Sequence, residues 1–406
     1  MIEPLLVTAP LYERFRRGEE RIVTPELELR RIHFARVPAA GESEAAWPEN
    51  DRFSFPLFLP HAAQFREALI ILNGLNDSSY RKFFPWAASL ARAGMPVLIF
   101  PSAFLLNRRP REWITPTASE RAWRERLPLA PDTATQINAP LSQRVAGRPR
   151  ALLQDALSTS RDLTLLATSI WNGQLLDATG AVPFRPGTVS HLLGYSLGGY
   201  LALALRLRDA AFEGSKVIAL CAGACVDPRA DERLDPVSPF ILDRHAAGLL
   251  LDDLATLRRS AAPLGPLAET LVELFAGTSV ATRERIAALG SDLTVLAGGE
   301  DRVVPALNIA ANLGRLDAVL PLGIHEYPFN LGAYQAAEGL REIARSHRVA
   351  PSFESAFRSF FGLVLAALRN HSPVQHGDHL IGALRERRIG GGDDTRDVQR
   401  LLHLEE

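Results

Sequence analysis

The chain has 406 residues, of which 47% are hydrophobic and 22% charged, and its formal net charge is −1. This is an ordinary composition for a soluble globular protein, and the near-neutral charge gives no reason to expect nucleic acid or an anionic membrane as the main partner. Because the sequence has only two cysteines, no run of about 18 apolar residues and no secretory-leader pattern, we expect a cytoplasmic protein without a disulfide framework.

The first segment, 1–60, predicts short strands that lead into a larger core. RIVTPELELRRIHFARV alternates between apolar and polar residues over parts of its length, and RFSFPLFLP follows a loop rich in proline and acidic residues. ALIILNG at 68–74 is a continuous apolar run, which is typical of a strand buried on both faces. A helical pattern at 79–94 and another apolar run at 95–101 complete a strand–helix–strand unit, which predicts parallel strands.

Later apolar runs predict further strands, separated by segments with helical patterns. They lie at 188–196, 216–226, 292–305 and 317–323. The expected fold is therefore an α/β fold with a mostly parallel, doubly wound sheet, whose core comprises 61–226 and 291–370. A polar C-terminal tail, 371–406, follows this core.

Two segments interrupt the alternation of strands and helices. Residues 102–150 are rich in proline and arginine and too long for a plain loop. Because this segment follows the carboxyl end of a strand, where such sheets bind ligands, we expect an insertion over the cleft. Residues 227–290 show helical patterns broken by prolines and predict a helical cap that excludes water and shapes a pocket.

The stretch HLLGYSLGGYLALAL at 191–205 places Ser196 between two glycines, after an apolar run and before a helical pattern. A serine at a direct strand-to-helix turn is held in a strained conformation that presents its hydroxyl to the cleft. Gly194 and Gly198 suit that turn, because strand and helix backbones crowd there. The predicted strand before the motif and helix after it favour a nucleophile over a merely structural turn.

LLGYSLGGYLALAL, ILNGLNDSS, VLAGGEDRVVP and a late histidine together resemble the α/β-hydrolase superfamily of esterases, lipases and thioesterases. The resemblance covers 65–100, 188–226 and 292–370, and does not reach the two insertions. AFLLNRRPREW is similar to a little-characterised bacterial branch of that superfamily. The resemblance implies the α/β-hydrolase fold and a catalytic triad in the chain order serine, acid, histidine.

The resemblance further implies that Asp301 is the acid, since it follows the LTVLAGG strand, and that His325 is the base, since it follows the last strand. Asp301 would orient the imidazole, and His325 would take the Ser196 proton. One departure is that Glu326 and Tyr327 follow His325, where family members often have small residues. Other candidates therefore stay open, namely Asp227 and Glu300 for the acid and His376 and His379 for the base.

An oxyanion hole would use two backbone N–H groups. Leu197 directly follows the candidate nucleophile, and Leu75 lies in the loop after the first buried strand. The superfamily usually has His-Gly in that loop, whereas this chain has Asn73-Gly74, which also fits an ordinary turn. In the insertion, polar and aromatic side chains are candidates to bind a carboxylate or phosphate, or else to pair with surface acids: Asn107, Arg108, Arg109, Arg111 and Trp113.

These features predict a serine hydrolase that cleaves a carboxylic ester or thioester through an acyl-enzyme, with no cofactor and no metal. One alternative is an acyltransferase that uses the same triad and passes the acyl group to an alcohol or amine. Another is a non-catalytic binding protein of the same fold, which the settings of His325 and Asn73 favour. The expected partner is a small acyl ester or thioester, while its identity and the oligomeric state stay open.

Overall fold

The computed structural model describes residues 3–36, 47–62, 64–75, 77–222, 241–260, 264–299, 301, 303–320, 325 and 351–369. The strands are β1 (Arg21–Val23), β2 (Leu27–Ala35), β3 (Arg52–Pro60), β4 (Phe65–Leu72), β5 (Val97–Phe100), β6 (Leu176–Asp177), β7 (Gly180–Ala181), β8 (Phe184–Tyr195), β9 (Val217–Leu220), β10 (Leu293–Gly298) and β11 (Ala318–Leu320). The helices are α1 (Glu3–Arg16), α2 (Pro48–Asp51), α3 (Phe84–Arg92), α4 (Pro116–Arg126), α5 (Ala139–Gly147), α6 (Ala151–Trp171), α7 (Leu197–Arg208), α8 (Arg244–Arg259), α9 (Pro266–Ala276), α10 (Val280–Ala288), α11 (Ala306–Leu313) and α13 (Pro351–Leu368). Within these ranges, no helix combines the length and apolar character that crossing a membrane requires.

One sheet of nine strands organises this part of the chain, in the order β1-β2-β3-β5-β4-β8-β9-β10-β11. All pairs from β5 to β11 are parallel, whereas β1, β2 and β3 add an antiparallel edge beside β5. The predicted α/β fold with a mostly parallel sheet is confirmed. This strand order, with an antiparallel strand beside β5 and parallel crossovers after it, is that of the α/β-hydrolase fold.

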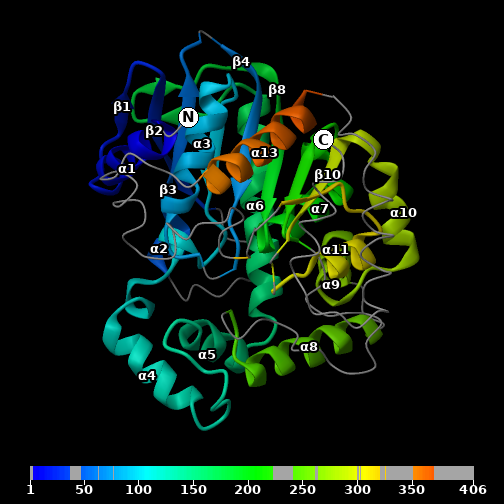
Figure 1. Cartoon of the computed structure of the whole chain (residues 1–406). Helices are drawn as coiled ribbons and strands as arrows, with labels where there is room; N and C mark the ends of the chain where they lie inside the picture. Colours follow the sequence, from blue (N-terminus) through cyan, green and yellow to red (C-terminus); the bar gives the residue numbers. More distant parts are fainter. Residues whose placement is uncertain are drawn as a thin grey trace.

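Helices cover both faces of the sheet (Figure 1). On one face, α3 packs against β3 and β5 and is flanked by α1 and α13. On the other face, α6 and α7 pack against β8, and α9 lies against both of them. Such double covering explains why the central strands are continuous apolar runs in the sequence, since neither of their faces meets water.

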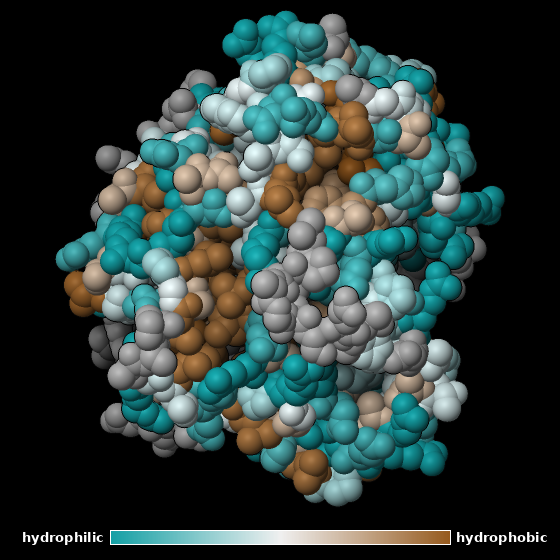
Figure 2. All heavy atoms as spheres, turned by 180° about the vertical axis from the view of Figure 1, so that it is seen from behind, coloured by the Kyte–Doolittle hydropathy of each residue, from teal (hydrophilic) through white to brown (hydrophobic). Residues whose placement is uncertain are grey.

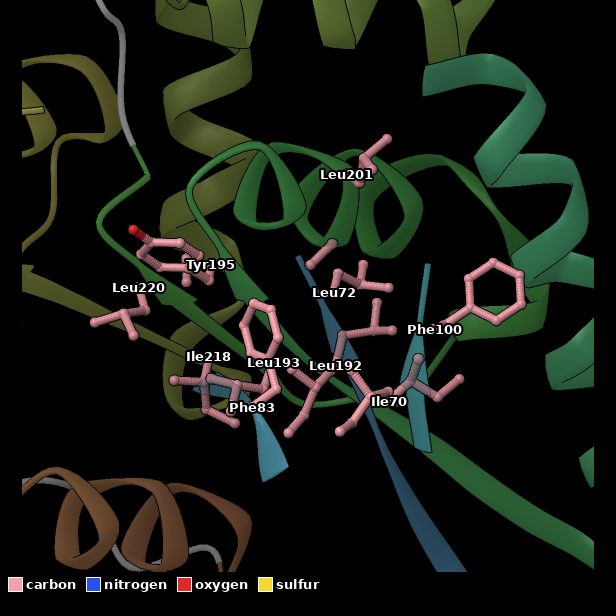
Figure 3. Packing of buried hydrophobic residues seen from close by; sticks show 14 of the residues in the cluster. Ile70, Leu72, Phe83, Phe100, Leu192, Leu193, Tyr195, Leu201, Ile218 and Leu220 are labelled. Carbon is pink, nitrogen blue, oxygen red and sulfur yellow. The ribbon is translucent and has the colours of Figure 1, made fainter. Parts of the chain in front are cut away.

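The core is centred on β4, β5, β8 and β9, whose buried residues, including Phe100 of β5, pack together with Phe83 (Figure 3). All four residues of β5 and all four of β9 are buried. Burial of each such Leu, Ile or Phe side chain contributes about 1.5–3 kcal/mol. The apolar runs predicted as buried strands therefore form the rigid frame from which the loops of the site extend.

The chain begins with α1, which the strand pattern predicted for 1–60 did not include. Leu11 and Phe15 are buried and lie one helical turn apart. The Phe15 and Tyr12 rings lie 5.7 and 5.2 Å from the ring of Phe84 on α3. This contact between α1 and α3 explains the helix, because one apolar stripe is enough to hold a helix on a folded core.

The helices α4, α5 and α8 form a layer below the sheet in Figure 1, which we call the cap. The Arg126 guanidinium at the end of α4 donates through Nε and Nη2 to the two carboxylate oxygens of Asp243, each at 2.7 Å. These two residues are 2% and 0% exposed, and Asp243 also caps α8 by accepting the Ala246 N–H. One buried ion pair therefore links the insertion at 102–150 to the helix α8.

The helices of the predicted cap segment 227–290 pack against different neighbours. Helix α8 packs against α5 of the cap, whereas α9 packs against α6 and α7 of the core as well as against α8. The buried ion pair of Arg126 and Asp243 links α8 to the insertion, and no spacing in the sequence reveals this pair. Residues 227–240 and 261–263 of that segment, and the predicted tail at 371–406, lie outside the described residues.

Seen from behind, the surface is mainly hydrophilic, with apolar areas between the polar ones (Figure 2).

Candidate active site

Ser196 lies at the sharp turn between β8 and α7. Its backbone has φ 52° and ψ −117°, a region that residues other than glycine rarely adopt and that costs about 1–3 kcal/mol. The turn is held on both sides, because the Ser196 N–H donates to the Leu220 carbonyl on β9 and the Gly199 N–H donates to the Ser196 carbonyl. Ser196 is therefore fixed at the carboxyl end of the sheet, as the strand–helix context predicted.

The glycines around Ser196 make this turn possible. A Cβ atom at Gly194 would lie 2.2 Å from the Gly198 carbonyl oxygen, and one at Gly198 would lie 2.4 Å from the Leu72 carbonyl oxygen. A Cβ atom at Gly199 would lie 2.3 Å from the Cβ of Ala222. Both glycines of the motif are thus required by close approach of backbones, and Gly199 by the approach of α7 to the end of β9.

Three polar side chains from three strand ends meet at this turn. The Ser196 Oγ lies 2.9 Å from His325 Nε2, and His325 Nδ1 lies 2.9 Å from Asp301 Oδ2. All three residues are buried, with 6%, 5% and 5% exposure for Ser196, His325 and Asp301. Because a carboxylate only accepts, Nδ1 carries the proton and Nε2 is free to accept the serine proton. The arrangement can therefore deprotonate Ser196 during an attack.

Asp301 is held by its own loop. Its second oxygen, Oδ1, accepts the N–H groups of Val303 and Val304 at 2.9 and 2.8 Å. The carboxylate thus has backbone donors on one oxygen and the imidazole on the other. This leaves it in a fixed orientation toward His325.

Cys221, which directly follows β9, is a neighbour of Asp301 that no sequence motif singles out. Its backbone has φ 50°, and the side chain is fully buried. Burial raises the pKa of the Cys221 thiol well above its usual range, and the charge of Asp301 and a hydrogen bond to it raise that pKa further. The thiol therefore stays protonated and acts as a donor toward the acid rather than as a nucleophile.

The loop after β4 is fixed against the same turn by Asn73 and Asp77. The Asn73 side chain donates to the Gly74 carbonyl and accepts the Ser102 N–H, each at 2.8 Å, so it ties this loop to the end of β5. Asp77 accepts the Gly74 N–H at 2.7 Å and pairs with Lys82 at 2.5 Å. The asparagine that departs from the superfamily pattern therefore has a structural role, and Asp77, three residues after Gly74, is a loop anchor that the spacing alone does not reveal.

The two N–H groups expected to form an oxyanion hole belong to residues that flank the turn. Leu197 is the first residue of α7, and the first N–H groups of a helix have no acceptor within it. Leu75 follows Gly74, where a Cβ atom would lie 2.8 Å from the Tyr195 ring and 3.2 Å from the Ser196 Cβ. The N-terminus of α7 also places positive partial charge beside Ser196.

Two pockets open beside this turn. The apolar pocket has an empty volume of about 520 Å³ and is lined by Ser196 and by side chains of α8 and α9, among them Leu250, Leu254 and Phe275. The second, which we call the arginine pocket, has an empty volume of about 540 Å³ and is lined by residues of the insertion and of α6. Leu75, Leu152 and Leu197 line both, so the two pockets meet beside the proposed oxyanion donors.

The candidate substrate residues of the insertion divide into two groups. Arg109 and Trp113 line the arginine pocket, together with Arg144, whose guanidinium lies 4.2 Å from the centre of the Phe104 ring. Burial lowers the pKa of Arg109, although the nearby Asp77 opposes this. Arg144 pairs with Asp155, so its charge is matched within the protein.

Arg108 and Asn107 are not among the residues that line these two pockets. Arg108 is fully buried, pairs with Asp162 at 2.8 Å and donates to Asn50 at 3.0 Å. Asn107 accepts the Tyr80 hydroxyl and donates to a backbone carbonyl of β3. Through these contacts both side chains attach the insertion to the core. Arg111 is exposed, with Glu49 at 3.6 Å.

Four further candidates lie outside the described residues: Asp227, Glu300, His376 and His379. Among the residues that are described, no group of three or more His, Cys, Asp or Glu side chains is arranged to hold a metal ion. The described geometry thus brings together Ser196, His325 and Asp301 from the predicted set.

The family described as "Family of unknown function (DUF6051)" matches residues 37–260, more than half of the chain. This match includes Ser196 and the insertion and ends before Asp301 and His325. No curated protein matches the chain in sequence.

Among solved structures, brefeldin A esterase, a bacterial homologue of human hormone-sensitive lipase, is 14% identical with a TM-score of 0.41, and the match covers 91% of this chain and 87% of that one. Acetyl xylan esterase 1 from Thermoanaerobacterium sp. JW/SL YS485 is 14% identical with a TM-score of 0.40, covering 84% and 93%. TT1662 from Thermus thermophilus is 17% identical with a TM-score of 0.35, covering 67% and 86%. Because these identities and TM-scores are low, the α/β-hydrolase fold is recognised from the strand order and from the turn at Ser196.

Proposed function

The chain belongs to the DUF6051 family of unknown function, and we propose that this member is a serine hydrolase that cleaves carboxylic esters or thioesters. The observation that carries the proposal is the strained Ser196, whose hydroxyl lies 2.9 Å from an imidazole that is itself 2.9 Å from a buried carboxylate. A serine at a merely structural turn has no need of a base and of an acid from two other strand ends.

In the proposed reaction, Ser196 Oγ attacks the carbonyl carbon while its proton passes to His325 Nε2. Asp301 keeps the imidazole in the tautomer that accepts this proton and stabilises the imidazolium that forms. The Leu197 and Leu75 N–H groups stabilise the negative oxygen of the tetrahedral intermediate. His325 then protonates the leaving alcohol or thiol, and a water molecule hydrolyses the acyl-enzyme by the same route in reverse.

Labelling with a fluorescent fluorophosphonate tests the proposal, because this reagent reacts only with an activated serine. We expect the wild type to be labelled, and we expect the label to be lost in Ser196→Ala and in His325→Ala. Ser169→Ala, at a half-buried position of α6, and His33→Ala, at an exposed position of β2, provide matched controls, and both should keep the label. His379→Ala should keep it as well.

Absence of label on the wild type, or its retention in Ser196→Ala, would remove the serine hydrolase proposal and leave a binding protein of the same fold. Loss of label in His379→Ala, with retention in His325→Ala, would move the base to the C-terminal segment. Product analysis with an added alcohol or amine separates hydrolysis from acyl transfer, since only an acyltransferase gives the new ester or amide as its main product.

A further inference from the structure

An ester or thioester substrate has an acyl part and an alcohol or thiol part, and the apolar pocket beside Ser196 suits only one kind of group. Ser196 is one of the residues that line this pocket. A group that fills the pocket therefore lies beside the proposed nucleophile and close to the carbonyl that it would attack. Apart from Ser196, the described lining consists of aliphatic and aromatic residues. A charged group would lose its hydration there without gaining an oppositely charged partner, since the polar side-chain groups among these residues are the hydroxyls of Ser196 and Tyr200.

Its walls come from elements that are fixed independently. Leu250, Leu251 and Leu254 lie on α8 at the spacing of one helix face. Phe275 on α9 is stacked on Tyr200 of α7, with ring centres 4.7 Å apart and an angle of 20° between the planes. The position of α8 is set in turn by the buried pair of Arg126 and Asp243. The pocket is therefore preformed between the core and the cap.

The arginine pocket on the other side of the shared leucines has a different chemistry. Its lining includes the charged side chains of Arg109, Arg144 and Asp155, of which the last two pair with each other. Trp113, Ser102, Thr159 and apolar residues complete the lining. Natural esters and thioesters commonly combine a hydrocarbon acyl chain with an alcohol or thiol that carries polar or charged groups. The two pockets match these two parts in chemical character.

We infer that the apolar pocket binds the acyl part of the substrate and that this part is an aliphatic chain longer than acetyl, because the lining side chains of α8 and α9 offer hydrocarbon contacts beside Ser196. The inference rests on the proposed serine hydrolase function. The alcohol or thiol part then lies toward Arg109 and Trp113.

A series of p-nitrophenyl esters with 2, 4, 6, 8 and 10 acyl carbons tests this on the full-length protein. The leaving group is constant, so differences in kcat/KM report the acyl part. We expect kcat/KM to rise about fourfold for each added methylene until the pocket is full. Leu251→Trp, at a half-buried position of the pocket wall, should lower kcat/KM for the octanoyl ester about tenfold or more and leave the acetyl ester within about twofold.

Thr256→Trp places the same side chain at an exposed position of the same helix and should leave the whole series unchanged. As a second variant that removes bulk, Phe275→Leu should move the optimum toward longer chains. The inference is overturned if the wild type cleaves the acetyl ester but shows no preference for longer chains, or if Leu251→Trp lowers all esters equally. If no ester is cleaved and fluorophosphonate does not label Ser196, the proposed function itself fails and takes this inference with it.

Discussion

At the scale of single residues, the site depends on the absence of side chains at two glycines as much as on the side chains of the triad residues. Gly194 and Gly198 leave room for β8 to turn directly into α7, and that room lets Ser196 adopt φ 52°. The surrounding backbone hydrogen bonds outweigh the strain at this one residue. The sequence motif predicted this arrangement because a strand that turns directly into a helix brings two backbones close together. Glycine is required at the points of closest approach.

Gly198→Ala should destabilise the protein, because the new methyl group would lie 2.4 Å from the Leu72 carbonyl oxygen. We expect a loss of about 1–3 kcal/mol or more in the free energy of unfolding, measured by urea denaturation. Gly248→Ala is the matched control, since Gly248 lies inside α8 and a Cβ atom there meets nothing within 4 Å. That change should stabilise the helix by about 0.5–1 kcal/mol. Equal effects of the two substitutions would refute the steric argument.

Other residues of the site gained their meaning only from the structure. Asn73 reads as a departure from the superfamily pattern, yet it ties the loop after β4 to the end of β5. No sequence motif singles out Cys221, yet it lies against Asp301. Neither could be predicted, because the partners of both lie on other strands. A single sequence carries no signal for contacts of this kind.

At the scale of elements, a buried ion pair decides how the cap is built. The pairing of α4 with α8 through Arg126 and Asp243 joins segments 117 residues apart. Burial opposes ionisation of Asp243, but hydrogen bonds from Arg126 and the Ala246 N–H together outweigh it and lower the pKa of this carboxyl. The pair is held in the ionised form and fixes the wall of the apolar pocket.

Asp243→Asn should loosen the cap, because it leaves the Arg126 guanidinium buried without its carboxylate. Breaking such a pair costs about 3–5 kcal/mol, which hydrogen exchange of the α8 amides and urea unfolding would both detect. Asp253→Asn is the matched control on the same helix, since its partner Arg150 is exposed, and it should change stability by about 1 kcal/mol or less. Similar effects of both changes would contradict a special role for the buried pair.

The same pair predicts a direction for the pH dependence. A carboxyl whose pKa is lower in the folded state stabilises the fold above its unfolded pKa of about 3.9, and this stabilisation is lost as the pH falls through the lowered folded value. Wild-type stability should therefore fall in acid more steeply than that of Asp243→Asn.

At the scale of the whole molecule, distant parts of the chain complete the core. Helix α13 covers the same face of the sheet as α3 (Figure 1). Its last turn is held by Lys216, a buried residue just before β9, whose Nζ donates to the Leu368 carbonyl at 2.6 Å. A cation at a helix C-terminus satisfies a carbonyl that has no partner within the helix.

Lys216→Met should weaken the docking of α13, since the Leu368 carbonyl loses a charged donor. We expect a loss of about 1.5–3 kcal/mol and faster proteolysis at α13, followed by mass spectrometry. Arg66→Gln, at an exposed position of β4, is the control and should change neither. Unaltered protection of α13 in Lys216→Met would show that apolar contacts alone hold the helix.

The sequence by itself determined the α/β fold, the buried parallel strands and the strand–turn–helix around Ser196, because continuous apolar runs and paired glycines have local causes. It also ordered Ser196, Asp301 and His325 along the chain, although only the structure brought the three together within hydrogen-bonding distance. Tertiary structure alone decided that α4, α5 and α8 form one cap, that Arg108 and Asn107 lie away from the pockets, and that α1 precedes the sheet. These features depend on contacts between residues far apart in the chain, and the periodicity of a single sequence records only what neighbouring residues do.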